Sequence, residues 1–267
     1  MLNDMVVLPA IACYSEGSRS PFPGYPTGSR SRQRRRLSMT SELDSARPPL
    51  IPPLTMPLEE AMRTQRAIRR LRPDPVDDAL VLRLIELALK APTGLNAQNW
   101  EFVMVKDRQV KARLARLHRL AWGLYGRIGR RLTANDPHMQ RLLDAVQYQA
   151  DHFEDIPALV VACLRGFRPL WPPLAVTSYY GSIHPSVQNL LLAARAAGLG
   201  AALITLPLWS TWLACRVLGL PWRVTPCAVV PLGWPMGRYG PTTRRAVGDV
   251  VHLDRYGHQP FKKQSMG

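Results

Sequence analysis

The chain has 267 residues, of which 46% are hydrophobic and 20% are charged, which is enough apolar material for one sizeable core or two small ones. Its formal net charge is +16, an excess that admits a polyanionic partner such as nucleic acid. Nucleic acid is nevertheless not favoured, because the arginines are scattered and no zinc-finger or RNA-binding motif is present. The one long stretch of low polarity, residues 185–208, is interrupted by Gln188, Asn189 and Arg195, so neither a membrane span nor a membrane partner is predicted.

The first 55 residues differ in composition from the rest of the chain. Prolines and serines are frequent, and the run Arg34-Arg35-Arg36 adds charge, so this part buries little apolar surface and is predicted to be disordered. Two other interpretations stay open: a transit peptide, or translation that begins at Met39 or Met56. We therefore divide the chain into an N-terminal extension, residues 1–55, and a globular domain, residues 56–267.

From residue 57 onward the pattern is that of a globular protein. A short helix opens at Pro57, which is followed by two glutamates in the first turn, and a second helix follows the start signal Asp74-Pro75. Hydrophobic spacing and turn residues predict further strands at 101–106, 157–164 and 227–232, and helices at 109–132, 139–153 and 182–197. Because strands alternate with helices, the fold class is α/β or α+β.

The cysteines and histidines do not indicate a metal site. Cys13, Cys163, Cys215 and Cys227 have no CxxC spacing, and apolar surroundings predict reduced, structural thiols in a cytoplasmic protein. The six histidines form no helical pair of the metalloprotease type, and no Ser-His-Asp set is convincing. We therefore predict no metal ligand and assign no side chain as catalytic.

Two arginine-rich stretches are candidates for binding an anion. The first is Arg66-Ala67-Ile68-Arg69-Arg70, whose three arginines cannot all face a core and whose fork geometry suits phosphate or a carbonyl oxygen. The other follows the strand that ends at Leu232-Gly233-Trp234-Pro235 and includes Arg244-Arg245. For each stretch the alternative is a solvated basic surface.

A third candidate is the segment Ala91-Pro92-Thr93-Gly94-Leu95-Asn96-Ala97-Gln98-Asn99-Trp100, which joins a helix to a strand. Gly94 permits a turn that exposes backbone N–H groups. The amides of Asn96 and Gln98 each offer a donor and an acceptor, as the edge of a pyrimidine-like ring requires. A plain connecting loop is the alternative.

Together these stretches resemble the nitroreductase family of FMN enzymes, over about residues 56–259. The family has an early arginine motif, an Ala-Pro-Ser-x-x-Asn-x-Gln-Pro-Trp segment, a helix that ends in Gly-Leu-Gly, and a final Leu-Gly-Tyr-Pro with arginines. The corresponding residues here are 66–69, 91–100, Gln188–Ala194 through Gly198-Leu199-Gly200, and 232–235 with Arg244-Arg245. Each motif is weak alone, but four in the right order are specific. Departures include Ala67 for a serine and Asn99 for a proline.

The resemblance implies an α+β fold, with a central mixed, mainly antiparallel sheet flanked by helices, in an intertwined homodimer that holds FMN at its interface. It implies phosphate, ribityl and pyrimidine contacts from Arg66, Ala67 and Arg69, and a second phosphate contact from Arg244. Pro92, Thr93 and Gly94 would line the flavin, while Asn96 and Gln98 would approach from the partner subunit. Ile204, Thr205 and Leu206 would present backbone N–H groups near the flavin N5.

The activity implied is a ping-pong transfer of hydride from NAD(P)H through FMN to a small electron-poor acceptor, such as a nitroaromatic or a quinone. Within the family, the branch that makes dimethylbenzimidazole carries an aspartate where this chain has Ala67, which argues against that activity. A reductive dehalogenase of the iodotyrosine type stays open, because residues 204–208 resemble that branch. A non-enzymatic flavin- or nucleic-acid-binding protein is the alternative from another class.

Overall fold

The structure is a computed structural model that describes residues 54–262. The predicted extension, residues 1–55, lies almost wholly outside the described residues, so its disorder and its boundary stay predictions. The described residues form seven α-helices, which are α3 (Leu58–Thr64), α4 (Asp78–Ala88), α5 (Arg108–Leu132), α6 (Pro137–Asp151), α7 (Pro173–Gly181), α8 (His184–Ala196) and α9 (Thr211–Leu218). Short 3-10 turns are η2 (Gly94–Asn96), η3 (Phe153–Asp155), η4 (Leu206–Leu208) and η5 (Val247–Asp249).

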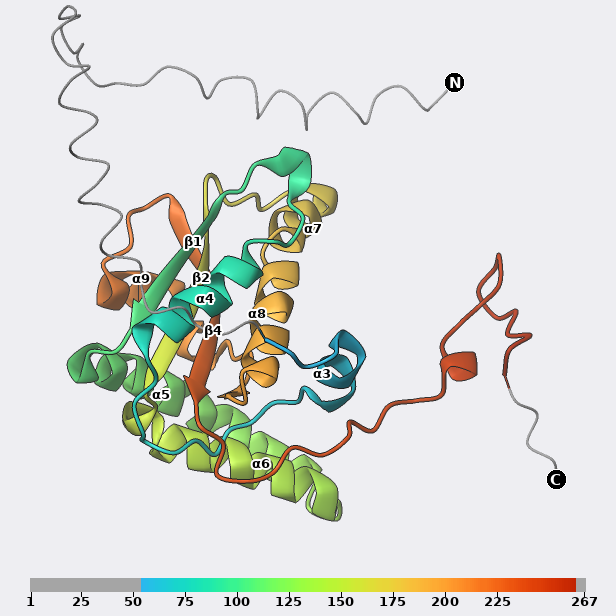
Figure 1. Cartoon of the computed structure of the whole chain (residues 1–267), viewed down its shortest axis with the longest axis horizontal. Helices are drawn as coiled ribbons and strands as arrows, with labels where there is room; N and C mark the ends of the chain where they lie inside the picture. Colours follow the sequence, from blue (N-terminus) through green and yellow to red (C-terminus); the bar gives the residue numbers. More distant parts are fainter. Residues whose placement is uncertain (1–53, 263–267) are drawn as a thin grey trace, which may run out of the picture.

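Four strands form one antiparallel sheet in the order β1-β2-β4-β3 (Figure 1). They are β1 (Trp100–Val105), β2 (Ala158–Arg165), β3 (Gly200–Ala201) and β4 (Val224–Gly233). In the middle of the sheet Val161 of β2 lies between Val103 of β1 and Val229 of β4. A parallel bridge between Ala67 and Ala201 continues the sheet beyond β3. The predicted α+β class and mainly antiparallel sheet are confirmed.

Helices cover both faces of the sheet, which explains why β2 is an unbroken apolar run. Its even-numbered side chains pack with α4 and α8, and its odd-numbered side chains pack with α5 and α9. Every residue of β2 except Arg165 is buried. A strand that is buried on both faces has no polar side to alternate with its apolar one.

Local capping determines where the helices begin and end. The Asp107 carboxylate accepts the Val110 N–H before α5, and the Asp136 carboxylate accepts two N–H groups before α6. After α8, Gly198 has a φ of 76°, which confirms its predicted role beyond the helix end. The second helix starts later than predicted, because Asp77 rather than Asp74 provides the cap of α4.

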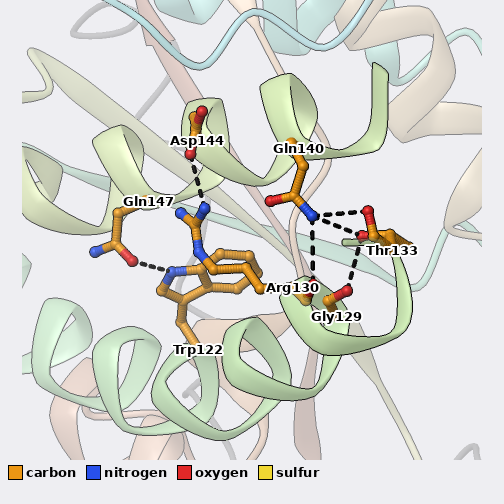
Figure 2. Close-up of polar contacts among 7 residues, drawn as sticks. All are labelled: Trp122, Gly129, Arg130, Thr133, Gln140, Asp144 and Gln147. Atoms are coloured by element: carbon orange, nitrogen blue, oxygen red, sulfur yellow. Dashed lines mark hydrogen bonds and ion pairs between the residues drawn. The ribbon is translucent and has the colours of Figure 1, made fainter. Parts of the chain in front are cut away.

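Helices α5 and α6 form an antiparallel hairpin below the sheet in Figure 1, and polar contacts fix its register (Figure 2). The Trp122 indole donates to the side-chain oxygen Oε1 of Gln147 at 2.8 Å, and Arg130 forms an ion pair with Asp144 at 2.9 Å. At the turn, Gln140 Nε2 donates to the Thr133 carbonyl oxygen at 2.8 Å. The Trp122–Gln147 bond joins the middle of the two helices, and the contacts of Arg130 and Gln140 hold the end next to the turn.

Candidate functional site

The first arginine segment connects α3 to α4 and lies against two other predicted motifs. The Ile68 N–H donates to the Ala201 carbonyl at 3.0 Å, next to the Ala67–Ala201 bridge. The Arg72 N–H donates to the Trp234 carbonyl at 2.8 Å. The fold therefore brings the early arginine motif, the Gly-Leu-Gly helix end and the late Leu-Gly-Trp-Pro motif together at one end of the sheet.

Gly200 makes this close approach possible. A Cβ atom at this position would lie 2.6 Å from Leu71 Cδ2 and 2.8 Å from Ile68 Cγ2, both of which are closer than real Cβ contacts. The glycine of the Gly-Leu-Gly motif is thus required by packing, since the arginine segment lies directly on it.

None of the three arginines of the segment has a carboxylate partner within residues 54–262, and Arg70 lies over the Tyr148 ring. Arg66 is exposed, and its guanidinium lies next to Gly240 of the C-terminal segment. A Cβ atom built on that glycine would be 3.9 Å from Arg66 Nη1. Arg69 is half-buried, and that burial lowers the pKa of its guanidinium below the usual value. Neighbouring arginines do have partners, since Arg63 pairs with Glu59 and Arg72 with Asp74. A half-buried cation without a counterion favours an anionic ligand.

Arg244 reaches the same region through the C-terminal segment. The backbone N–H and the hydroxyl of Thr242 both donate to the Arg63 carbonyl, at 3.0 Å and 3.1 Å. Arg244 is exposed and lines a cleft of about 750 Å³, together with Arg63, Gln65 and Gln188. The structure thus places the predicted second phosphate ligand close to the end of α3.

Of residues 204–206, which are predicted to offer backbone N–H groups to a ligand, only two have that group free within the described part of the chain. The Ile204 N–H donates to the Val229 carbonyl at 2.9 Å, and the Ile204 carbonyl accepts the Val229 N–H at 2.9 Å. The N–H of Ile204 is therefore not available to a ligand. The N–H groups of Thr205 and Leu206 have no recorded acceptor among residues 54–262. Of the three predicted donors, Thr205 and Leu206 are therefore the ones free for a ligand.

The loop of residues 92–99 lies far from the arginine segment. The Gly94 N–H donates to the Ser182 hydroxyl at 3.4 Å, which places the loop before the N-terminus of α8, whereas Leu199 and Gly200 follow its C-terminus. A helix of this length separates its two ends by about 20 Å. Figure 1 shows the loop beside α7, well away from α3. Pro92, Thr93, Gly94, Asn96 and Gln98 are therefore not brought to Arg66 and Arg69 within one chain.

The loop has an unusual backbone. Leu95, Asn96 and Gln98 adopt left-handed φ values of 52°, 53° and 47°, whereas the sequence predicts the turn at Gly94. The Gln98 N–H donates to the Thr93 hydroxyl at 3.2 Å, and Gln98 Nε2 donates to Asn96 Oδ1 at 3.1 Å. The pair still has one amide nitrogen and one amide oxygen to offer. Such strain in neighbouring residues is typical of a binding loop.

Two residues of this region are absent from the sequence-based prediction. Arg195 of α8 donates from Nε to the Thr64 hydroxyl at 2.8 Å, and its guanidinium lies 4.1 Å from the centre of the Tyr239 ring. The Tyr239 hydroxyl donates to the Leu199 carbonyl, and burial raises the pKa of Tyr239 to about 12. Together they tie α3, α8 and the C-terminal segment around the arginine segment. The only signal in the sequence is an arginine within the apolar helix.

The cysteines of the described part are unpaired and poorly reactive. Burial raises the pKa of the Cys163 thiol to about 12 and that of Cys227 to about 11, so both stay protonated at neutral pH. Between residues 54 and 262 no group of three metal-ligating side chains is found, and no helix there is long and apolar enough to cross a membrane.

Comparison with known proteins agrees with this architecture. The sequence matches the nitroreductase family over residues 62–234, and the chain belongs to that family. An NADH dehydrogenase of Thermus thermophilus is 28% identical over 204 residues, covering 74% of this chain and 97% of the relative. The predictions of the family and of an oxidoreductase are confirmed, and FMN with NAD(P)H is the cofactor pair of that family, as the sequence predicts.

Two solved structures share the fold. The NADPH:FMN oxidoreductase of Vibrio harveyi, complexed with NAD⁺, has a TM-score of 0.55 and 20% identity, covering 74% of this chain and 77% of the other. An iodotyrosine deiodinase bound to FMN and 3-iodo-L-tyrosine has a TM-score of 0.55 and 21% identity, covering 75% of this chain and 98% of the other. At these identities the likeness concerns the fold alone.

Proposed function

We propose that this chain binds FMN and transfers a hydride from NAD(P)H to a small electron-poor acceptor, such as a nitroaromatic or a quinone. The observation that carries the proposal is the meeting of the arginine segment, the Gly-Leu-Gly helix end and the segment that carries Arg244 at one edge of the sheet. FMN, when bound, would supply the hydride-transfer chemistry that links NAD(P)H to the second substrate in a ping-pong cycle.

The residues present fit such a cofactor. FMN carries a phosphate and a ring edge with carbonyl oxygens, and both need cationic or N–H donors. Arg66 and Arg244 are exposed and form no ion pair within residues 54–262, and Arg69 is half-buried in the same segment as Arg66. Glu59 also lines the cleft of Arg244, but its carboxylate pairs with Arg63. We assign phosphate binding to Arg66 and Arg244, and the pyrimidine edge to Arg69, where its fixed charge also stabilises the reduced, anionic ring.

A complete site needs a second copy of the chain. Because the loop of residues 92–99 lies at the other end of α8, we propose that it contacts the flavin held by the partner subunit. This extends the prediction made for Asn96 and Gln98 to the whole loop, including Pro92, Thr93 and Gly94. The Asn96–Gln98 pair then offers its free amide nitrogen and oxygen to the ring edge.

The course of the C-terminal segment supports the homodimer. After β4 the chain leaves the body of the molecule and runs outward in an extended conformation (Figure 1). Its apolar side chains Val247, Val250 and Tyr256 are 74%, 50% and 94% exposed. An extended arm with exposed apolar side chains is expected to pack on a partner. The unpaired cysteines support a reducing compartment such as the cytoplasm.

The proposal is tested by visible absorption spectroscopy of the purified full-length protein. A flavin band is expected that bleaches when NADPH is added anaerobically and returns when a nitroaromatic is added. A halogenated phenol in place of the nitroaromatic tests for the reductive dehalogenase. Arg69→Ala is expected to lose bound FMN, whereas the exposed Arg72→Ala, which only breaks the pair with Asp74, is expected to keep it. A colourless protein that takes up no added FMN would refute the proposal.

A further inference from the structure

A second surface with a distinct chemistry lies on α9 and the turn that follows it. Trp212, Leu213 and Arg216 lie on α9 at the spacing that places side chains on one side of a helix. Trp209 comes just before the helix, and Trp222 with Arg223 follows in the turn after it. We call these six residues the tryptophan face. Trp209 is 54%, Trp212 64% and Trp222 82% exposed, which is unusual for the largest apolar side chain.

Each of two tryptophans carries a guanidinium group on its ring. Arg216 lies 4.8 Å from the centre of the Trp212 ring, and Arg223 lies 4.6 Å from that of Trp222. Neither arginine forms an ion pair with a described carboxylate. The tryptophan face therefore combines broad aromatic surface with uncompensated positive charge.

The sequence around this face carries no negative charge. Between Asp155 and Asp249 the chain has no aspartate or glutamate, although it contains Arg165, Arg168, Arg195, Arg216, Arg223, Arg238, Arg244 and Arg245. The stretch includes all of α9 and the turn after it. This stretch of sequence thus carries only positive charge, which favours an anionic surface as its partner.

Helix α9 lies on the other side of the sheet from α8, although Trp209 of the tryptophan face follows the proposed donors Thr205 and Leu206 directly in the chain. Ala214 of α9 packs in the core cluster that holds the odd-numbered side chains of β2, whereas α8 packs on the even-numbered ones. Helices α9 and α8 therefore cover opposite faces of the sheet. The loop of residues 92–99 contacts the segment before α8, so the proposed dimer contacts do not require the tryptophan face.

We propose that the tryptophan face binds the surface of an anionic lipid bilayer. Tryptophan prefers the boundary between headgroups and acyl chains, where its ring is buried and its N–H stays hydrated. Arg216 and Arg223 then contact lipid phosphates, and Leu213 adds aliphatic surface for the acyl region. The sequence alone predicts no membrane partner, and this inference revises that expectation for surface attachment only.

Two other occupants fit the face less well. A second copy would oppose Arg216 and Arg223 to their own counterparts in a stretch without carboxylates, which is repulsive. Single-stranded nucleic acid stacks its bases on free aromatic faces in a groove. Here Arg216 and Arg223 already cover one ring face of Trp212 and Trp222.

The test is flotation of the FMN-loaded full-length protein with lipid vesicles. Vesicles that contain roughly one quarter phosphatidylglycerol in phosphatidylcholine are compared with pure phosphatidylcholine, at low salt because surface charge is screened by salt. Binding is expected only to the anionic vesicles. Two double variants test the face. One carries Trp212→Ala and Trp222→Ala, and the other carries Arg216→Glu and Arg223→Glu. Each is expected to reduce partitioning of the protein onto the anionic vesicles by about tenfold or more.

The matched control is Arg131→Glu with Arg141→Glu, which changes the net charge equally but lies at the far end of the α5–α6 hairpin. It is expected to keep most of the binding. The proposal is overturned if the control loses as much as the face variants, or if these bind as well as the wild type. Binding to a single-stranded oligonucleotide without binding to vesicles also overturns it. Circular dichroism and bound flavin verify that all variants are folded.

Discussion

Arg195 lies where three parts of the chain meet. Its side chain is 13% exposed and bonds to Thr64 at the end of α3, while its guanidinium stacks on Tyr239 of the C-terminal segment. Arg66 and Arg244 are carried by the two segments that it joins. We therefore regard Arg195 as a positioning residue for the arginines proposed to hold the FMN phosphate.

Replacement of Arg195 tests this role. Arg195→Ala is expected to weaken FMN binding about tenfold and to lower the free energy of unfolding by about 1–3 kcal/mol, since a partly buried hydrogen bond and a stacking contact are lost. Fluorescence titration with FMN and urea unfolding measure the two effects. Arg216→Ala is the control, because Arg216 also stacks on an aromatic ring but is exposed. Unchanged FMN affinity in Arg195→Ala would restrict this residue to a structural role.

His118 in α5 is a buried base without a hydrogen-bond partner in the described residues. It is 1% exposed, and burial lowers its pKa to about 4. In the unfolded chain its pKa is about 6.5, so protons bind preferentially to the unfolded state between these values. Above about pH 6.5 the ring is neutral in both states, and the free energy of unfolding is unaffected by it. As the pH falls toward 4, the unfolded state takes up a proton that the folded state does not, so the free energy of unfolding decreases.

We therefore expect His118→Leu to reduce the acid sensitivity of the protein. Between pH 7 and pH 5, the loss of unfolding free energy is expected to be smaller than in the wild type by on the order of 1–2 kcal/mol. Urea unfolding at both pH values measures it. His138→Leu serves as the control because His138 is exposed. An equal acid sensitivity in wild type and His118→Leu would contradict the expectation.

The α5–α6 hairpin shows which polar contacts stabilise an element (Figure 2). Gln140 caps the end of α5 through bonds to the carbonyl and hydroxyl of Thr133 and to the Arg130 carbonyl. These carbonyls are left unsatisfied by the helix itself. The ion pair between Arg130 and Asp144 is more exposed to solvent, so it contributes less.

Gln140→Ala is accordingly expected to lower the free energy of unfolding by about 1–2 kcal/mol, and Asp144→Ala by less than about 1 kcal/mol. Chemical denaturation gives both values under the same conditions. An Asp144→Ala effect that equals or exceeds that of Gln140→Ala would show that the ion pair, rather than the cap, holds the turn.

Elements with a strong pattern were predictable from the sequence, and weak ones were not. The helix expected at 109–132 is α5 within one residue, because Asp107 and the leucine spacing define its start. Helix α7 was missed since none of its residues is buried, and β3 because two residues leave no pattern. At the proposed site, residue chemistry pointed to Arg66 and Arg69, and their role in binding stays a prediction. The role of Arg195 depends on contacts between distant segments, which no local pattern records.

At the scale of the whole molecule, a shared site makes a distinctive prediction. If Arg69 and the loop of residues 92–99 come from different subunits, Arg69→Ala and the double variant Asn96→Ala with Gln98→Ala damage both sites of their own dimers. Co-expression of the two should produce mixed dimers in which one site is intact and the other carries all the changes. We expect about one FMN in each mixed dimer, measured by absorbance after separation on two affinity tags.

A site formed within one chain predicts a different result for the mixed dimers. If Arg69 and the loop served the same site within one chain, each site of a mixed dimer would carry one defect, and FMN would not be recovered. Wild-type dimers with the same tags define full occupancy. Mixed dimers that stay colourless would therefore exclude a site shared between subunits.

The arginine segment lies along one edge of the sheet, where it affects how readily the protein aggregates. Residues 66–70 lie beyond β3, whose outer backbone groups would otherwise be open to a strand from another molecule. Uncovered strand margins promote aggregation, and charged side chains placed along them oppose it. The arginines that we propose to bind the FMN phosphate therefore also place positive charge where it opposes strand addition from another molecule.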